Sequence, residues 1–262
     1  MISEETFTQL PRPSQELTLT TVFIDKNYLD VFKNWHKFSS RFIGPNLLVV
    51  SLDVETHQII EQLGITSQQI SWDGNLNSLW IARVAIFKQL LSAGYNLIHS
   101  DADAVWLKNP IPYCRSLTAD MAFSQGTVWP PKVHRNNGVV LCCGYFYLRS
   151  NSKTIAFTGS WMGSVIENED DQRALNELLL SMGMKWPMVE DYHLRWQEKK
   201  FRCFNEVQYC KLSNEMKITL LPHRLFQRIA EDKDAIVRHP LSMKDGFSTE
   251  QTLKQYNCWD YS

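Results

Sequence analysis

Two aspartates one residue apart, Asp101 and Asp103, are the first residues in this sequence whose spacing indicates chemistry. The apolar run at residues 95–99 precedes them, which is typical of a buried strand that ends at the edge of a sheet. Ligands of open α/β sheets bind at such edges. Carboxylate oxygens suit Mg²⁺ or Mn²⁺, and such an ion usually shares its remaining positions with substrate phosphates. The pair therefore predicts a metal–diphosphate site; the alternative is a turn whose carboxylates are solvated.

A histidine and a lysine near the C-terminus are candidates to complete this site. His239 follows the expected strand 235–238, where its imidazole is either a nitrogen ligand for Mn²⁺ or a structural histidine. Lys244 lies in the loop that follows, where its ammonium either neutralises a leaving diphosphate or is solvated. The metal interpretation of His239 requires the end of the chain to fold back onto the Asp pair.

Polar residues at other expected element ends are candidates for contacts to a nucleotide or a sugar. Arg83 and Lys88 lie on the helix expected before the Asp pair, where a solvated face is the usual interpretation; Arg83, near the helix start and beside Trp80, could instead reach phosphate or sugar. Asp53 ends the second expected strand, and it either accepts a hydrogen bond from a base or ribose or begins the next turn. Asp171 and Gln172 open a later helix, either as ordinary capping residues or as groups that hold sugar hydroxyls.

The hydrophobic periodicity predicts an α/β protein. The first part indicates strand 17–24, helix 28–38, strand 46–52, helix 54–63, loop 71–77, helix 79–93 and the strand before the Asp pair. This alternation favours a parallel, doubly wound sheet. The second part indicates strand 121–123, loop 124–138, strand 139–148, helix 151–166, a helix from Asp170 or Asp171, strands 217–221 and 235–238, and helix 248–256.

The ends of the chain and its continuity predict one domain. Residues 1–17 are expected to form a loosely docked arm, because Pro11 and Pro13 block regular structure. No linker or repeat divides residues 18–262, which are expected to form a single domain with Gly144 at a bend of its long strand.

Composition excludes several classes of function. The chain has 262 residues, 44% hydrophobic and 21% charged, with a net charge of −1, so no basic excess indicates nucleic acid or an anionic membrane surface. No signal peptide and no span of roughly 18 apolar residues is found, which predicts a soluble, cytoplasmic chain unless a longer natural protein carries an anchor. The six cysteines lack zinc-site spacing and are expected to be reduced, buried thiols.

Common catalytic motifs are missing, and two other classes of function remain alternatives. The sequence has no GxSxG elbow, GxGxxG motif or P-loop. A haloacid-dehalogenase-type phosphatase also has an apolar strand followed by Asp-x-Asp, with Asp101 as nucleophile, but its nucleophile strand normally opens the domain. A non-catalytic sugar-binding domain is the second alternative. Trp72, Trp129 and Tyr145 are either platforms for sugar rings or core residues.

The string YNLIHSDADAVWLKNP resembles the signature of the nucleotide-diphospho-sugar transferases that include plant rhamnogalacturonan xylosyltransferases and Skp1-modifying galactosyltransferases, which belong with glycosyltransferase family 77. The residues that match in order are Lys88, Gly94-Tyr95, Asp101, Asp103, Trp106-Leu107 and Pro110. The segments CCGYFYLRSN and DDQRALN and the closing His239-Pro240, Gly246 and Cys258-Trp259 are also similar. Cys142 stands where the family more often has Asn. The resemblance covers residues 20–259.

The resemblance implies a GT-A fold, with a Rossmann-like nucleotide half and an acceptor half in one mixed, mostly parallel sheet. It implies transfer of xylose, galactose or a similar sugar, with retention, from a UDP-sugar to a hydroxyl of a glycan or glycoprotein. Asp101, Asp103 and His239 would hold Mn²⁺ or Mg²⁺ against the diphosphate, and Gln172 or Asp171 would lie at the anomeric centre. The expected donor-binding residues are Ile24, Asp53, Arg83, Lys88, Asp101, Gly144 and Lys244, with Lys254 as an alternative to Lys244.

Overall fold

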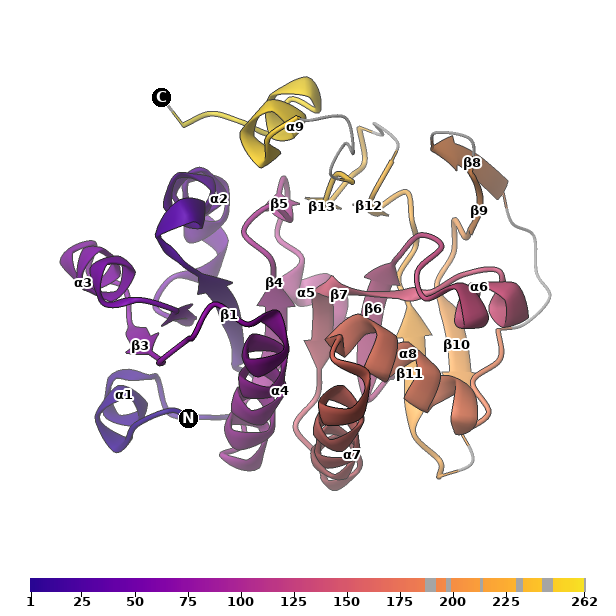
Figure 1. Cartoon of the computed structure of the whole chain (residues 1–262), viewed down its shortest axis with the longest axis horizontal. Helices are drawn as coiled ribbons and strands as arrows, with labels where there is room; N and C mark the ends of the chain where they lie inside the picture. Colours follow the sequence, from indigo (N-terminus) through magenta and orange to yellow (C-terminus); the bar gives the residue numbers. More distant parts are fainter. Residues whose placement is uncertain (187–191, 197–198, 213, 230–232, 242–246, 262) are drawn as a thin grey trace.

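The computed structural model describes residues 1–186, 192–196, 199–212, 214–229, 233–241 and 247–261, and it confirms the predicted α/β class (Figure 1). Within these residues the main sheet has eight strands in the order β10-β11-β6-β7-β4-β1-β2-β3. Its strands are β1 (Thr18–Ile24), β2 (Leu47–Ser51), β3 (Ser67–Gln69), β4 (Asn96–Ser100), β6 (Met121–Gln125), β7 (Leu141–Leu148), β10 (Gln208–Lys211) and β11 (Lys217–Leu220).

Two smaller sheets and the helices complete the described part of the chain. The small sheets contain β5 (Val105–Trp106), β12 (Phe226–Gln227) and β13 (Val237–Arg238), and β8 (Tyr192–Trp196) with β9 (Lys199–Cys203). The helices are α1 (Glu4–Gln9), α2 (Leu29–Ile43), α3 (Val54–Gln62), α4 (Leu76–Ser92), α5 (Ile111–Ser116), α6 (Pro131–Asn137), α7 (Ser152–Asn168), α8 (Asp171–Ser181) and α9 (Thr249–Gln255), with a 3-10 turn at Lys26–Tyr28. None of the helices in the described residues combines the length and apolar character needed to span a bilayer.

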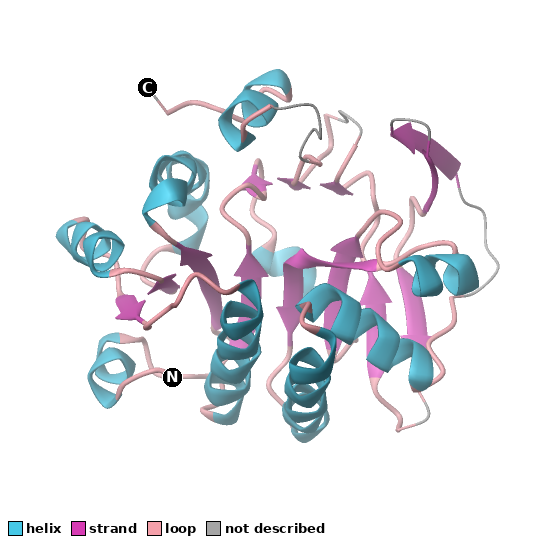
Figure 2. Cartoon of the chain, in the orientation of Figure 1, coloured by secondary structure: helices cyan, strands magenta, loops and turns pink. Residues whose placement is uncertain are grey.

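Alternation along the strands explains why helices cover both faces of the main sheet. In β2, Leu48 and Val50 join a core cluster with residues of α4, α7 and α8, whereas Leu47 and Val49 join a second cluster with residues of α2 and α5. Successive side chains of a strand point to opposite faces, so a continuous apolar run fills both layers. Figure 2 shows α4, α7 and α8 in front of the strands and α5 behind them.

The long strand β7 gives the sheet its mixed character. The predicted parallel half is confirmed, because β1 pairs parallel with both β2 and β4, and β2 with β3. In contrast, β7 runs antiparallel to both of its neighbours, β4 and β6. The C-terminal end of β4 and the N-terminal half of β7 therefore lie at the same edge of the sheet, where the Asp pair follows β4.

Three local expectations were wrong, and the residues explain why. The arm was expected to lack regular structure, but Ser3 caps α1 before the first proline and Ile2 and Leu10 are buried. The loop 124–138 contains α6, because Pro131 suits the first position of a helix and Gly138 adopts the left-handed conformation at its end. The short strands β3, β8, β9 and β10 have no predicted counterpart. The six cysteines are buried, as predicted.

Candidate metal and donor site

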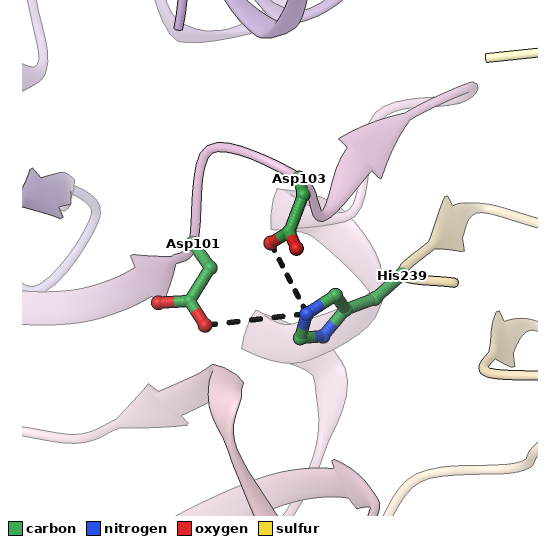
Figure 3. A group of neighbouring side chains, drawn as sticks. All are labelled: Asp101, Asp103 and His239. Atoms are coloured by element: carbon green, nitrogen blue, oxygen red, sulfur yellow. Dashed lines mark ion pairs between the residues drawn. The ribbon is translucent and has the colours of Figure 1, made fainter. Parts of the chain in front are cut away.

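The structure brings Asp101, Asp103 and His239 together, with one potential ligand atom of each within 4.8 Å of the others (Figure 3). His239 Nε2 lies 3.2 Å from Asp103 Oδ1 and 4.0 Å from Asp101 Oδ2. The Asp residues lie in the turn between β4 and β5. His239 follows β13, which pairs antiparallel with β5 and returns the end of the chain to the Asp pair.

The three potential ligand side chains and the space around them fit a divalent cation such as Mn²⁺. Two carboxylates and one imidazole combine hard oxygen with a borderline nitrogen ligand. Gly144 forms the wall beside them: a Cβ built there would lie 2.2 Å from His239 Cε1 and 2.5 Å from Asp101 Oδ2. Gly144 O also accepts a hydrogen bond from the Asp101 backbone N–H at 2.7 Å. The glycine therefore provides the room in which the two side chains approach each other.

The electrostatics of the cluster favour an ionised Asp101 and a protonated His239 when no cation is bound. Burial alone would raise the pKa of Asp101, but the hydrogen bond and charge of His99, together with Arg83 and His239, hold it well below its usual range. Burial and Arg228 oppose protonation of His239, but the charge and hydrogen bond of Asp103, together with the hydrogen bond of Cys142, raise the pKa of His239 to about 9. A bound cation would therefore replace a proton on His239.

Arg83 connects the Asp pair to α8. Its guanidinium forms a buried ion pair with Asp171 and lies 3.5 Å from Asp101 Oδ1. It also stacks over the Trp80 ring, 4.4 Å from the ring centroid. Burial raises the pKa of Asp171, and the charge of Arg83 offsets part of this effect. Arg83 and Asp171, two of the candidate site residues, are thus partners in one network behind Asp101.

A cavity of about 270 Å³ opens beside the Asp pair. Its lining residues are Phe23, Ile24, Asp25, Tyr28, Leu52, Trp72, Leu76, Leu79, Trp80, Arg83, Asp101, Ala102 and Asp103. Four expected donor-site or metal-site residues, Ile24, Arg83, Asp101 and Asp103, therefore share one cavity whose other walls are largely aromatic and aliphatic. A larger cavity of about 620 Å³ lies around Asn96 and Arg149, at the opposite edge of the sheet, and does not include the Asp pair.

Gln172 lies at the start of α8, and its side chain is hydrogen-bonded to β7. Its Oε1 accepts a hydrogen bond from Cys143 N at 3.1 Å, and its Nε2 donates to Trp129 O at 3.0 Å. One turn later, Asn176 is fully buried and bonds both Leu141 N and Leu141 O, at 2.8 and 2.9 Å. These bonds fix α8 to β7, so the side chain of Gln172 is held next to the strand that carries Gly144.

Three candidate residues do not join this cluster. Asp53 caps α3, accepting from Thr56 N at 2.8 Å, and also accepts from Lys26 N at 2.9 Å; it does not line the cavity. Lys88 lies against α7, where a Cβ at Gly159 would be 3.3 Å from Lys88 Nζ. Lys254 binds Glu250 on the exposed side of α9. Lys244 lies outside the described residues.

Two groups at the site were not found by sequence reasoning. His99 Nε2 lies 3.2 Å from Asp101 Oδ1. Its position two residues before Asp101 in the sequence was a signal for this contact. Arg228, which follows β12, donates to Cys142 Sγ at 3.1 Å and contacts His239 Nδ1. Burial raises the pKa of Cys142, but Arg228 and His239 outweigh it and lower the pKa to about 7. No sequence pattern indicated Arg228.

Comparisons with known proteins show the family and the fold to which the chain belongs. The model of the nucleotide-diphospho-sugar transferase family matches residues 43–254. The Arabidopsis thaliana protein named beta-arabinofuranosyltransferase RAY1 is 29% identical over 177 residues. The match covers 58% of this chain and 33% of RAY1, so the chain spans about a third of that relative's length.

Solved structures show the same fold. The glycosyltransferase GlyE of Streptococcus pneumoniae TIGR4 superimposes with a TM-score of 0.56 and 14% identity, covering 94% of this chain and 62% of that chain. The galactosyltransferase LgtC, solved with donor and acceptor sugar analogs, gives a TM-score of 0.51 and 10% identity, covering 93% and 96%. The predicted GT-A fold is confirmed.

Proposed function

The chain belongs to the nucleotide-diphospho-sugar transferase family, and we propose that it transfers a glycosyl group from a UDP-sugar to a hydroxyl of a glycan or glycoprotein. The observation that carries the proposal is the meeting of Asp101, Asp103 and His239 at the mouth of a cavity of about 270 Å³. Asp101 and Asp103 line the cavity, and Gln172 is bonded to Cys143, the residue before Gly144. A nucleoside diphosphate in the cavity would therefore reach a cation held by these aspartates.

The nucleotide would occupy the cavity between β1 and α4. Trp72, Trp80 and Tyr28 line it and offer apolar surface to a base and ribose, while Asp101 and Arg83 lie at its polar end. When bound, Mn²⁺ would supply Lewis-acid stabilisation of the charge that develops on the leaving diphosphate. Asp101, Asp103 and His239 would hold it, and Arg83 keeps Asp101 oriented through their 3.5 Å contact.

We propose transfer with retention, and the residues at the sugar end support a route that uses no protein nucleophile. Asp171 is buried in an ion pair with Arg83, so its carboxylate is not free to attack an anomeric carbon. Gln172 is fixed by Cys143 and Trp129 and is neutral, which suits a group that positions a sugar rather than a nucleophile. We therefore assign Gln172 to donor positioning. The acceptor hydroxyl would attack on the face from which UDP departs, with a leaving phosphate oxygen as base.

The donor sugar defines the decisive experiment. The purified chain is incubated with Mn²⁺ and a panel of UDP-xylose, UDP-galactose, UDP-glucose, UDP-arabinopyranose and UDP-arabinofuranose, and UDP release is measured. The last donor is included because RAY1 is named an arabinofuranosyltransferase. We expect release from one or two donors, lost in Asp103→Ala and kept in Asp30→Ala, whose carboxylate is 70% exposed on α2. No release from any donor would refute the proposal.

Two measurements separate the alternatives, one of ligand binding and one of phosphatase activity. For a catalytically inactive sugar-binding domain, UDP and Mn²⁺ would not raise the melting temperature; at about 100 times its dissociation constant a ligand stabilises a protein by roughly 2.7 kcal/mol. A phosphatase nucleophile strand would open the domain, whereas β4 follows β1 and β2. Release of phosphate from an aryl phosphate, abolished in Asp101→Asn, would support the phosphatase and contradict our proposal.

A further inference from the structure

Trp129 is an exposed aromatic residue that the donor site does not use. Its side chain is 47% exposed, although isolated exposed apolar residues are common on protein surfaces. A second observation distinguishes it: its backbone carbonyl accepts the side-chain amide of Gln172 at 3.0 Å. We propose that Trp129 forms the acceptor subsite, a platform on which a ring of an acceptor saccharide stacks. This inference rests on the proposed function and names the substrate class of the same site.

Three hydrogen bonds connect the ion site to Trp129. Asp101 N donates to Gly144 O at 2.7 Å, and Cys143 N, in the adjacent residue of β7, donates to Gln172 Oε1 at 3.1 Å. The amide of Gln172 then reaches the Trp129 carbonyl. A sugar positioned by Gln172 would therefore lie close to the backbone of the residue that carries the exposed indole.

The side of the site on which Trp129 lies favours the acceptor over the donor. The nucleotide cavity is formed by β1 and α4, whereas Gln172 belongs to α8 and Trp129 precedes α6. In Figure 1, α4 lies on one side of β7, and α8 and α6 lie on the other. The donor sugar must therefore lie between the cavity and Trp129. The acceptor hydroxyl would meet the anomeric carbon on the face from which UDP departs, and the ring that carries this hydroxyl would extend away from the filled nucleotide cavity, toward Trp129.

The backbone around Trp129 is held firmly. Gly126 N donates to Val140 O at 2.8 Å, and a Cβ at Gly126 would lie 2.6 Å from Val140 Cγ2, so the loop packs closely on its neighbour. On the other side, α6 begins at Pro131, and Val133 of this helix is buried. A surface that is already ordered loses little conformational entropy when a ligand binds. The indole can therefore act as a fixed platform.

The chemistry of the indole sets the class of ligand. A pyranose or furanose ring has a face of C–H groups, and an indole offers a large apolar surface with one polar N–H at its edge. Burying part of the exposed indole beneath such a face is favourable, and the hydroxyls of the saccharide remain in water. A charged or highly flexible acceptor lacking a ring would not use this surface.

The test compares transfer with hydrolysis in one preparation. The donor that the wild-type chain hydrolyses is supplied with methyl glycosides of arabinose, xylose, galactose and glucose as acceptor probes. We expect Trp129→Ala to lower the ratio of transfer to hydrolysis roughly tenfold, through the acceptor KM, because truncation of a contacting Trp typically weakens binding by this factor or more. Trp129→Phe should retain most of the ratio. Tyr209→Ala, which truncates an aromatic residue 48% exposed on β10, is the matched control and should not change it.

A binding measurement keeps the test independent of turnover. The chain is labelled with 5-fluorotryptophan, the Trp129 resonance is assigned with Trp129→Phe, and the glycosides are added with UDP and Mg²⁺. We expect this resonance to shift with at least one glycoside. An unchanged transfer ratio in Trp129→Ala, or a Trp129 resonance unmoved by every glycoside, would overturn the inference. Failure of the wild type to hydrolyse any UDP-sugar would instead contradict the proposed function.

Discussion

Replacing Gly144 with alanine should remove cation binding while leaving the fold intact. The added methyl group would lie 2.2 Å from His239 Cε1 and 2.5 Å from Asp101 Oδ2. Carbon atoms in contact are separated by about 3.5 Å, so the imidazole must move by roughly 1 Å. Metal–ligand distances are held to about 0.2 Å. Two of the three ligands would therefore leave their positions.

The expected loss can be expressed as a change in melting temperature. At a Mn²⁺ concentration about 100 times the wild-type dissociation constant with UDP present, the ion stabilises the protein by roughly 2.7 kcal/mol, or about 5–10 °C for a chain of this size. A 100-fold loss of affinity in Gly144→Ala would leave about 0.4 kcal/mol, or roughly 1–2 °C. Differential scanning fluorimetry with and without Mn²⁺ resolves this difference.

Gly163→Ala is the matched control. Gly163 lies in α7, and a Cβ there meets nothing within 4 Å. Alanine favours a helix over glycine, so this variant should melt at the same temperature or higher and keep the full Mn²⁺ shift. A full Mn²⁺ shift in Gly144→Ala would show that Asp101 and His239 do not bind the ion against Gly144, and would refute the reasoning.

Two further predictions concern pH and the buried ion pair. Because His239 carries a proton below its raised pKa of about 9 and a metal-bound imidazole does not, Mn²⁺ affinity should rise about tenfold per pH unit from pH 6.5 to 8. Asp101 adds no pH dependence there because its pKa is well below its usual range, and an affinity by calorimetry that is flat with pH would contradict this account. Arg83→Ala leaves Asp171 buried and unpaired, so the free energy of unfolding in urea should fall by about 3–5 kcal/mol. Arg173→Ala, which removes a partly exposed pair with Glu177, should change it by less than about 1 kcal/mol, and equal losses would argue against a special role for Arg83.

The sequence predicted those parts of the fold that depend on local patterns. The apolar runs of β1, β2, β4 and β7 and the helices α3 and α4 have strong periodicity, and each was expected within a few residues of its observed bounds. The strand β3, with residues Ser67–Gln69, is polar and short, and it exists because β2 offers a parallel edge. Pairing with a neighbour, rather than intrinsic propensity, decides such a strand.

The candidate site was predictable where chemistry leaves a local signature. Asp101 and Asp103 stand in a string that also contains the strand and the turn that position them. His239 was recognised by type and by family resemblance, and β13 brings it to the Asp pair through its pairing with β5. Arg228 could not be predicted, because its contact with Cys142 arises from the path of the chain after β12.

Candidates that failed to join the cluster show the limit of reasoning from position alone. Asp53 follows a parallel strand, as Asp101 does. Its carboxylate oxygens, however, accept hydrogen bonds from the backbone N–H groups of Thr56 and Lys26. Lys88 shares α4 with Arg83, but it faces α7 rather than the cavity. The sequence predicts which helix or strand carries a side chain. Packing between helices decides whether that side chain faces the ligand.

The return of β13 to β5 has a consequence for the order in which the protein is made. Synthesis proceeds from the N-terminus, so β1, β2, β4 and the walls of the nucleotide cavity leave the ribosome long before His239 does. A nascent chain that ends before residue 239 carries the two aspartates without the histidine of the proposed ligand set. That set is therefore complete only once β13 and His239 have followed β4 and the cavity walls out of the ribosome.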